Sequence, residues 1–271
     1  MPLRIGYSIT HSFEQPTPMI VMLNVHYSRA SDLEAPDTMI VAPSTPYTSY
    51  RDSFANWCNR LLAPAGLVRI SADTTIRDDG APDEVAPDAA QSRVEDLPEE
   101  ALLFLMPSRY CESDRLVDMA WELFGATPPG WARVQAVSAW VHQHITFGYE
   151  FARPGKTAWD ALQEGRGVCR DYAHLGVALC RALNVPARYC TGYLADIGVA
   201  EPLTPMDFSG WFEAYLGGRW YTVDPRNLVP RIGRVLIARG RDAADVAITT
   251  TFGPNQLCDF QVWTDPVPAP A

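Results

Sequence analysis

The chain has 271 residues, a net charge of −10 and 47% apolar residues. This length suits one large domain or two ordinary ones, and the composition allows a sizeable buried core. The acidic balance argues against nucleic acid and against an anionic membrane as partners. No apolar run approaches the roughly 20 residues of a membrane-spanning helix, and the first residues lack the apolar segment of a signal peptide. We therefore expect a cytoplasmic protein.

The first part of the chain has the composition of short strands separated by prolines. The expected strands, which show loose alternation of apolar and polar residues, are 3–11, 18–26, 39–41, 47–50 and 67–76. Such a succession of short strands is typical of a β-sandwich, which we place at residues 1–108. No titratable cluster stands out in it. The acidic stretch 78–96 is expected to be a solvated loop or linker.

After a connection at residues 109–130, apolar residues recur mainly at helical spacing. We expect helices at 114–124, 131–144, 158–164 and 169–183. The last of these has almost no polar face, so it should be buried on most sides. Asn184 and Pro186 then end it.

The remaining pattern indicates strands that form an antiparallel sheet. They are expected at 187–192, 208–216, 219–224, 233–239 and 257–263, with a tight turn at Gly217 and Gly218. The predicted fold class is therefore α+β. A β-sandwich precedes a core at 131–265, in which the helix that starts at Cys169 packs on the antiparallel sheet. Residues 266–271 should form a disordered tail.

Six scattered cysteines, none in a Cys-x-x-Cys pair, favour reduced and mostly buried thiols, with no structural zinc. Cys169 differs because a glycine-containing stretch, 165–167, delivers it to the first turn of a helix. The positive end of the helix dipole should lower its pKa toward the reactive range. A buried structural thiol is the alternative interpretation.

A cysteine at a helix start, followed by an antiparallel hairpin, is a layout of cysteine acyl chemistry. The thiolate attacks a carbonyl carbon, a histidine moves the proton, and a carboxylate orients the histidine. Residues 131–265 resemble the papain-like core of the transglutaminase-like superfamily. The resemblance is carried by segments 157–159, 165–174, 186–193, 211–216 and 220–225. Bacterial members often carry a β-sandwich before this core. The resemblance implies that Cys169 is the nucleophile and Asp224 the carboxylate.

One position departs from the family pattern. The family motif His-Ala-Trp is replaced here by Ser209, Gly210 and Trp211, so Ser209 stands where the resemblance implies the catalytic histidine. Asp224 could also simply cap the turn that it begins.

Another histidine could act as the base. The candidates are His142, His144 and His174, or a histidine from a partner protein. His174 follows Cys169 by five residues on the same helix, so it points roughly 140° away around the helix axis.

The sequence therefore leaves two main hypotheses open. The first is a cysteine protease, amidase or transglutaminase-type acyltransferase that uses Cys169 on a peptide, protein or small amide, weakly because the histidine is absent. The second is a pseudoenzyme whose cleft binds a peptide or protein partner. A redox-responsive thiol is a third hypothesis.

No cofactor is implied, because no carboxylate-rich loop resembles the calcium sites of animal transglutaminases. Five arginines between 226 and 241 could border a cleft for an acidic ligand, or be solvated or ion-paired.

Overall fold

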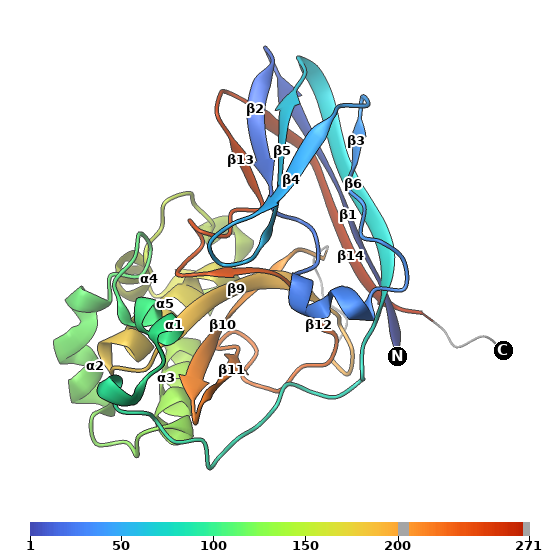
Figure 1. Ribbon diagram of the computed structural model, residues 1–271. Helices are drawn as coiled ribbons and strands as arrows, with labels where there is room; N and C mark the ends of the chain where they lie inside the picture. Colours follow the sequence, from blue (N-terminus) through green and yellow to red (C-terminus); the bar gives the residue numbers. More distant parts are fainter. Residues whose placement is uncertain (200–205, 268–271) are drawn as a thin grey trace.

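Two four-stranded antiparallel sheets form the β-rich part of the molecule (Figure 1). This computed structural model describes residues 1–199 and 206–267. One sheet has the order β14–β1–β6–β3, made of Gln256–Pro266, Pro2–Phe13, Gly66–Arg77 and Ile40–Ala42. The other has the order β13–β2–β5–β4, made of Thr249–Thr251, Thr17–Val21, Trp57–Ala63 and Tyr47–Arg51. Apolar side chains from both sheets share one core, so a β-sandwich is confirmed, but its last N-terminal strand ends at Arg77 and the predicted boundary at residue 108 is wrong.

A third antiparallel sheet carries the helices. Its order is β11–β10–β9–β12, made of Arg219–Val223, Ser209–Leu216, Ala187–Leu194 and Arg234–Gly240. The helices are α1 (Glu99–Leu102), α2 (Val117–Phe124), α3 (Trp131–His144), α4 (Ala158–Glu164) and α5 (Cys169–Ala182). The α+β class is thereby confirmed. None of the helices in the described ranges is long and apolar enough to cross a membrane.

Strand β14 belongs to the sandwich and not to the helical core. It pairs with β1 from Leu3 opposite Pro266 to Ser12 opposite Gln256. Placing 257–263 in a core at 131–265 was therefore wrong for this strand, because an alternating pattern identifies a strand but not its partner. Pro266 is also part of β14 and was wrongly assigned to the disordered tail, whereas residues 268–271 lie outside the described residues.

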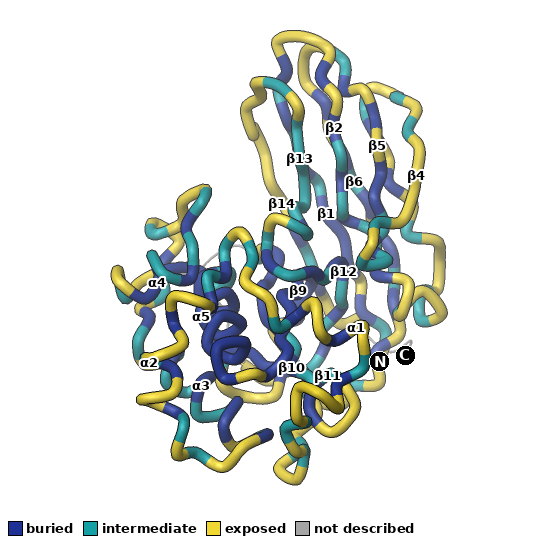
Figure 2. The backbone as a smooth tube through the Cα atoms, turned by 60° about the vertical axis from the view of Figure 1, so that its left-hand side comes forward, coloured by how far each residue is buried: buried dark blue, intermediate teal, exposed yellow. Residues whose placement is uncertain are grey.

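The sandwich and the helical core are joined by the sheet between them. The sandwich core includes Tyr189, Tyr193, Val235 and Ile237 from strands β9 and β12. A second apolar cluster surrounds α5 and includes side chains from β10 and β11. Every residue of β9 is buried, as expected for a central strand covered on both faces. In Figure 2, α5 is correspondingly dark blue along nearly its whole length.

The acidic stretch 78–96 is anchored at several residues instead of being wholly solvated; Gln91, for example, donates a hydrogen bond to the Leu183 carbonyl at 2.9 Å. Both carboxylate oxygens of Asp83 accept hydrogen bonds from the Arg234 guanidinium, at 2.9 Å each. Asp83 also accepts a hydrogen bond from the backbone N–H of Arg231 at 3.0 Å. The prediction of a solvated linker is therefore wrong at Asp83, because charge alone does not reveal a distant arginine.

Truncation after Asn255 tests whether β14 completes the sandwich. It removes β14, so β1 loses one of its two paired strands and the core loses Val262. At about 1 kcal/mol for each lost backbone hydrogen bond, we expect a loss on the order of 5 kcal/mol or more in the free energy of unfolding. Urea unfolding followed by circular dichroism measures this. Truncation after Val267 is the control and should leave the midpoint unchanged; equal midpoints for both proteins would contradict the assignment.

Candidate functional site

The loop before Cys169 is fixed by the end of α4 and by a short parallel pairing. The Thr157 side chain and Asp160 form a capping box at the start of α4, and Gly165 ends it in the left-handed conformation, with φ of 60°. Strands β7 (Thr146–Phe147) and β8 (Arg166–Gly167) then pair side by side. This pairing holds the loop against the end of α3, and α5 begins at the next turn.

A buried charge network lies directly beneath this loop. The Asp171 carboxylate accepts a hydrogen bond from the Val168 backbone N–H at 2.8 Å, which caps the start of α5. The ammonium of Lys156, which is fully buried, lies 3.9 Å from Asp171 and 2.9 Å from Glu164. Gly167 is required here because a Cβ would lie 2.5 Å from the Asp171 carboxylate. The network therefore sets the position of the cysteine.

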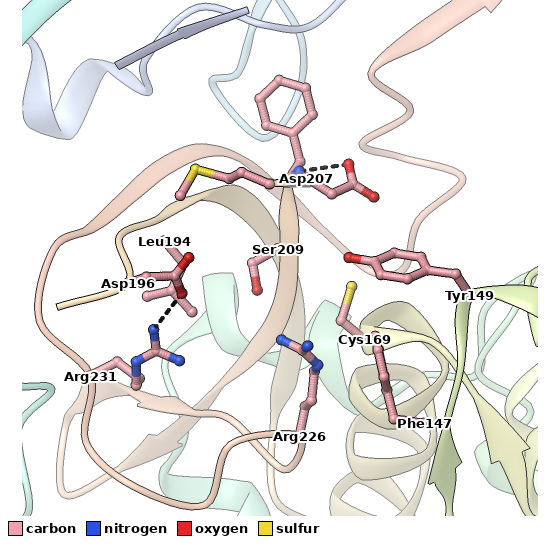
Figure 3. A pocket seen from close by; sticks show the side chains of 11 residues that line it. Phe147, Tyr149, Cys169, Leu194, Asp196, Asp207, Ser209, Arg226 and Arg231 are labelled. Carbon is pink, nitrogen blue, oxygen red and sulfur yellow. Dashed lines mark hydrogen bonds and ion pairs between the residues drawn. The ribbon is translucent and has the colours of Figure 1, made fainter. Parts of the chain in front are cut away.

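Cys169 and Ser209 line one pocket at the N-terminal end of α5. Figure 3 shows the Cys169 sulfur, the Ser209 side chain and the Arg226 guanidinium arranged around a common space, with the Tyr149 ring reaching in beside the sulfur. Asp207 lies on the other side of this space. The sequence therefore identified two residues that the fold brings together.

The Cys169 thiol has a raised pKa, not the lowered pKa expected from its place in the helix. Burial raises it to about 11, and the nearby negative charge of Asp207 adds to the effect. The backbone N–H of Gly210 hydrogen-bonds the sulfur and Arg226 lies near it, and both lower the pKa by smaller amounts. Desolvation of the thiolate thus outweighs the helix dipole.

Asp224 does not line this pocket and is engaged elsewhere. One carboxylate oxygen accepts backbone hydrogen bonds from Arg226 and Asn227, at 3.2 Å each. The other accepts from the Asn227 side chain at 2.8 Å and from the Arg234 guanidinium at 2.9 Å. Asp224 therefore both caps its turn and pairs with a buried arginine, and it faces a different cavity.

None of the five histidines, all of which are described, lines the pocket of Cys169. Nδ1 of His142 lies 2.9 Å from the carbonyl oxygen of Pro225. His144 stacks on Trp140 and bonds a backbone carbonyl of α4. His174 is fully buried, and burial holds its pKa well below the ordinary value. The remaining two, His11 and His26, lie in the sandwich region.

Several pocket residues were not anticipated from the sequence. Tyr149 begins a single 3₁₀ turn and Asp207 lies outside any helix or strand, so no periodic pattern marks either residue as functional. Arg226 belongs to the arginine-rich stretch that was a candidate border for an acidic ligand. Across residues 1–199 and 206–267, no three His, Cys, Asp or Glu side chains gather to hold a metal ion.

Comparison with known proteins places the chain in a family. A model of the transglutaminase-like superfamily core matches residues 118–225, which include Cys169, Ser209 and Asp224. A solved structure from Cytophaga hutchinsonii, described as a candidate cysteine protease, is 32% identical, with a TM-score of 0.84 over 100% of this chain and 92% of its own. The chain belongs to the transglutaminase-like superfamily.

Two uncharacterized mycobacterial proteins share part of this transglutaminase-like chain. That of Mycobacterium leprae is 32% identical over 118 residues, which are 42% of this chain and 42% of the relative. That of Mycobacterium tuberculosis is 34% identical over 117 residues, 38% of this chain and 37% of the relative. The chain thus spans less than half the length of these curated relatives.

The raised pKa predicts a steep pH dependence for alkylation of Cys169. With a pKa of about 11, the thiolate fraction and hence the rate with iodoacetamide should rise about tenfold per pH unit between pH 7 and 10. Peptide mapping by mass spectrometry follows Cys169, and the exposed Cys258 controls for reagent decay. A rate at Cys169 that does not change between pH 7 and 9 would show that the thiolate already exists at neutral pH.

Replacing Lys156 with Met tests the buried network. The change leaves the buried Asp171 without its cation, so the free energy of unfolding at pH 7 should fall by about 3–5 kcal/mol. Burial already raises the pKa of Asp171. Without Lys156 the carboxyl should hold its proton to higher pH, so the deficit should shrink as pH falls from 7 to 5.

Arg153→Met is the matched control for this variant. Arg153 also pairs with Glu164, but its side chain is half exposed, so the loss should stay below about 1 kcal/mol. Equal losses in the two variants, measured by urea unfolding, would contradict a special role for the buried pair.

Proposed function

We propose that this transglutaminase-like protein uses its cleft to bind a peptide or protein partner and does not turn over amides at an appreciable rate. One observation carries the proposal. The pocket around Cys169 contains no imidazole, and Ser209 stands where the family resemblance implies a histidine.

Amide cleavage needs a group that takes the thiol proton and returns it to the leaving amine. A serine hydroxyl cannot do this at neutral pH. With a pKa of about 11, only about one Cys169 in ten thousand is a thiolate at pH 7. Loss of one triad member costs on the order of 10⁴ to 10⁶ in rate. The missing base, the small thiolate fraction and the rate lost with one triad member together favour binding over hydrolysis.

Asp224 supports the same proposal. In a working triad the carboxylate orients the histidine. Here both oxygens of Asp224 already accept hydrogen bonds, and its ion pair with Arg234 is buried. Its contacts are those of a structural residue.

Slow acyl transfer from thioesters or activated esters is a second candidate function. The Cys169 side chain is partly accessible within the pocket, and the Gly210 N–H already donates to its sulfur. A thiolate or phenolate leaving group departs without a proton, so the missing histidine matters less than for an amide. The resemblance to a candidate cysteine protease agrees with this option.

Ser209→His tests the proposal directly. If only the base is missing, the variant should hydrolyse peptide p-nitroanilides at least ~10²-fold faster than the native protein, the usual range for a positioned acid–base group. Release of p-nitroaniline measures the rate. The control is Ser209→His combined with Cys169→Ala, which should abolish the gain.

One result would count against the proposal, and a second would show how far the site departs from a working triad. Amide hydrolysis by the native protein at the rate of the variant would exclude a non-hydrolysing cleft. Absence of activity in both proteins would show that Ser209 is not the only feature that departs from a working site.

A further inference from the structure

We propose that the Cys169 pocket binds a carboxylate group of its ligand through Arg226 and Ser209, so that it selects an acidic peptide side chain over the corresponding amide. The inference rests on the proposed binding function and names the ligand class.

Arg226 supplies a positive charge that forms no close ion pair among the described residues and acts on Asp207 only at longer range. Three other arginines of the same stretch have carboxylate partners: Arg231 pairs with Asp196, Arg234 with Asp83 and Asp224, and Arg241 with Asp245. Within residues 1–199 and 206–267, no carboxylate forms an ion pair with Arg226. Its guanidinium instead lies 4.1 Å from the ring of Phe147, which fixes its direction toward the pocket.

Ser209 supplies a buried hydroxyl that lacks a partner among the described residues. The residue is only 9% exposed, and its backbone carbonyl accepts a hydrogen bond from Thr191 at 3.1 Å. The hydroxyl points into the pocket beside Arg226 (Figure 3). Because the hydroxyl opens onto the pocket, it can donate a hydrogen bond to a ligand oxygen there.

The charges of the pocket are separated rather than mixed. Arg226, Ser209 and the positive end of α5 lie together, whereas Asp207 lies across the opening. Arg231 and Asp196 neutralise each other at 3.3 Å. A single carboxylate fits the positive side, and an uncharged or cationic remainder fits the side of Asp207. Guanidinium groups bind carboxylates through two parallel hydrogen bonds, which an amide cannot match.

The first test compares two alkylating reagents of similar size at pH 9. Iodoacetate carries the carboxylate that the site should attract, and iodoacetamide carries the neutral amide. We expect the ratio of iodoacetate to iodoacetamide rates to be about tenfold higher at Cys169 than at the exposed Cys258. Arg226→Gln should lower the Cys169 ratio to that of Cys258, and Arg226→Lys should keep part of it. Any change in thiol pKa affects both reagents equally and cancels in the ratio.

The second test does not depend on the thiol. The peptide N-acetyl-Ala-Glu-Ala-amide should raise the melting temperature of the Cys169→Ala protein more than its Gln counterpart does, and Arg226→Gln or Ser209→Ala should remove the difference. N-acetyl-Ala-Ala-Ala with a free C-terminus distinguishes a terminal carboxylate from a side-chain carboxylate.

Equal reagent ratios at Cys169 and Cys258, together with equal shifts from the Glu and Gln peptides, would overturn the proposal. That outcome differs from failure of the proposed function, which would appear as native amide hydrolysis and says nothing of the reagent ratio.

Discussion

The burial of α5 is the constraint on which the rest of the structure depends. Every residue from Asp171 to Ala182 is buried, between the third sheet on one side and the other helices on the other. Gly176 allows β10 to approach, because a Cβ there would lie 2.5 Å from the ring of Phe212. Only the first turn of the helix reaches the pocket, so Cys169 lies at the edge of the core. The same burial that fixes the thiol in place also raises its pKa.

Arg234 explains why the third family position has a structural role of its own. Its buried guanidinium lies 4.5 Å from the ring of Trp211 and pairs with both Asp83 and Asp224. Removing either carboxylate would leave the largely buried cation with less compensation. Through its ion pair with Arg234, Asp224 thus connects the end of β11 to β12 and to the acidic stretch 78–96. Its presence in the sequence is therefore no evidence by itself for a working triad.

Local signals in the sequence were sufficient to predict the bounds of the helices near the site. The capping residues Thr157 and Asp160 and the C-terminal Gly165 delimit α4 at the predicted residues, and the apolar run after Cys169 gives α5 to within one residue. Features that depend on distant contacts were missed. Strand β5 escaped prediction because Cys58 and Asn59 are both buried, which breaks the alternation. The raised thiol pKa depends on burial and on Asp207, and neither is visible from the helix start.

A serine where the family resemblance implies a histidine changes what the pocket can offer a ligand. An imidazole exchanges protons, whereas the Ser209 hydroxyl beside Arg226 offers a hydrogen bond next to a fixed positive charge. A carboxylate that binds such a pair is a poor electrophile, because its carbon already carries two negatively charged oxygens and no ready leaving group. A pocket that selects an acid over an amide therefore gains little from a nucleophilic thiol. Under the proposed function, the raised pKa of Cys169, the missing base and the arginine without an ion pair fit one site that holds its ligand rather than cleaving it.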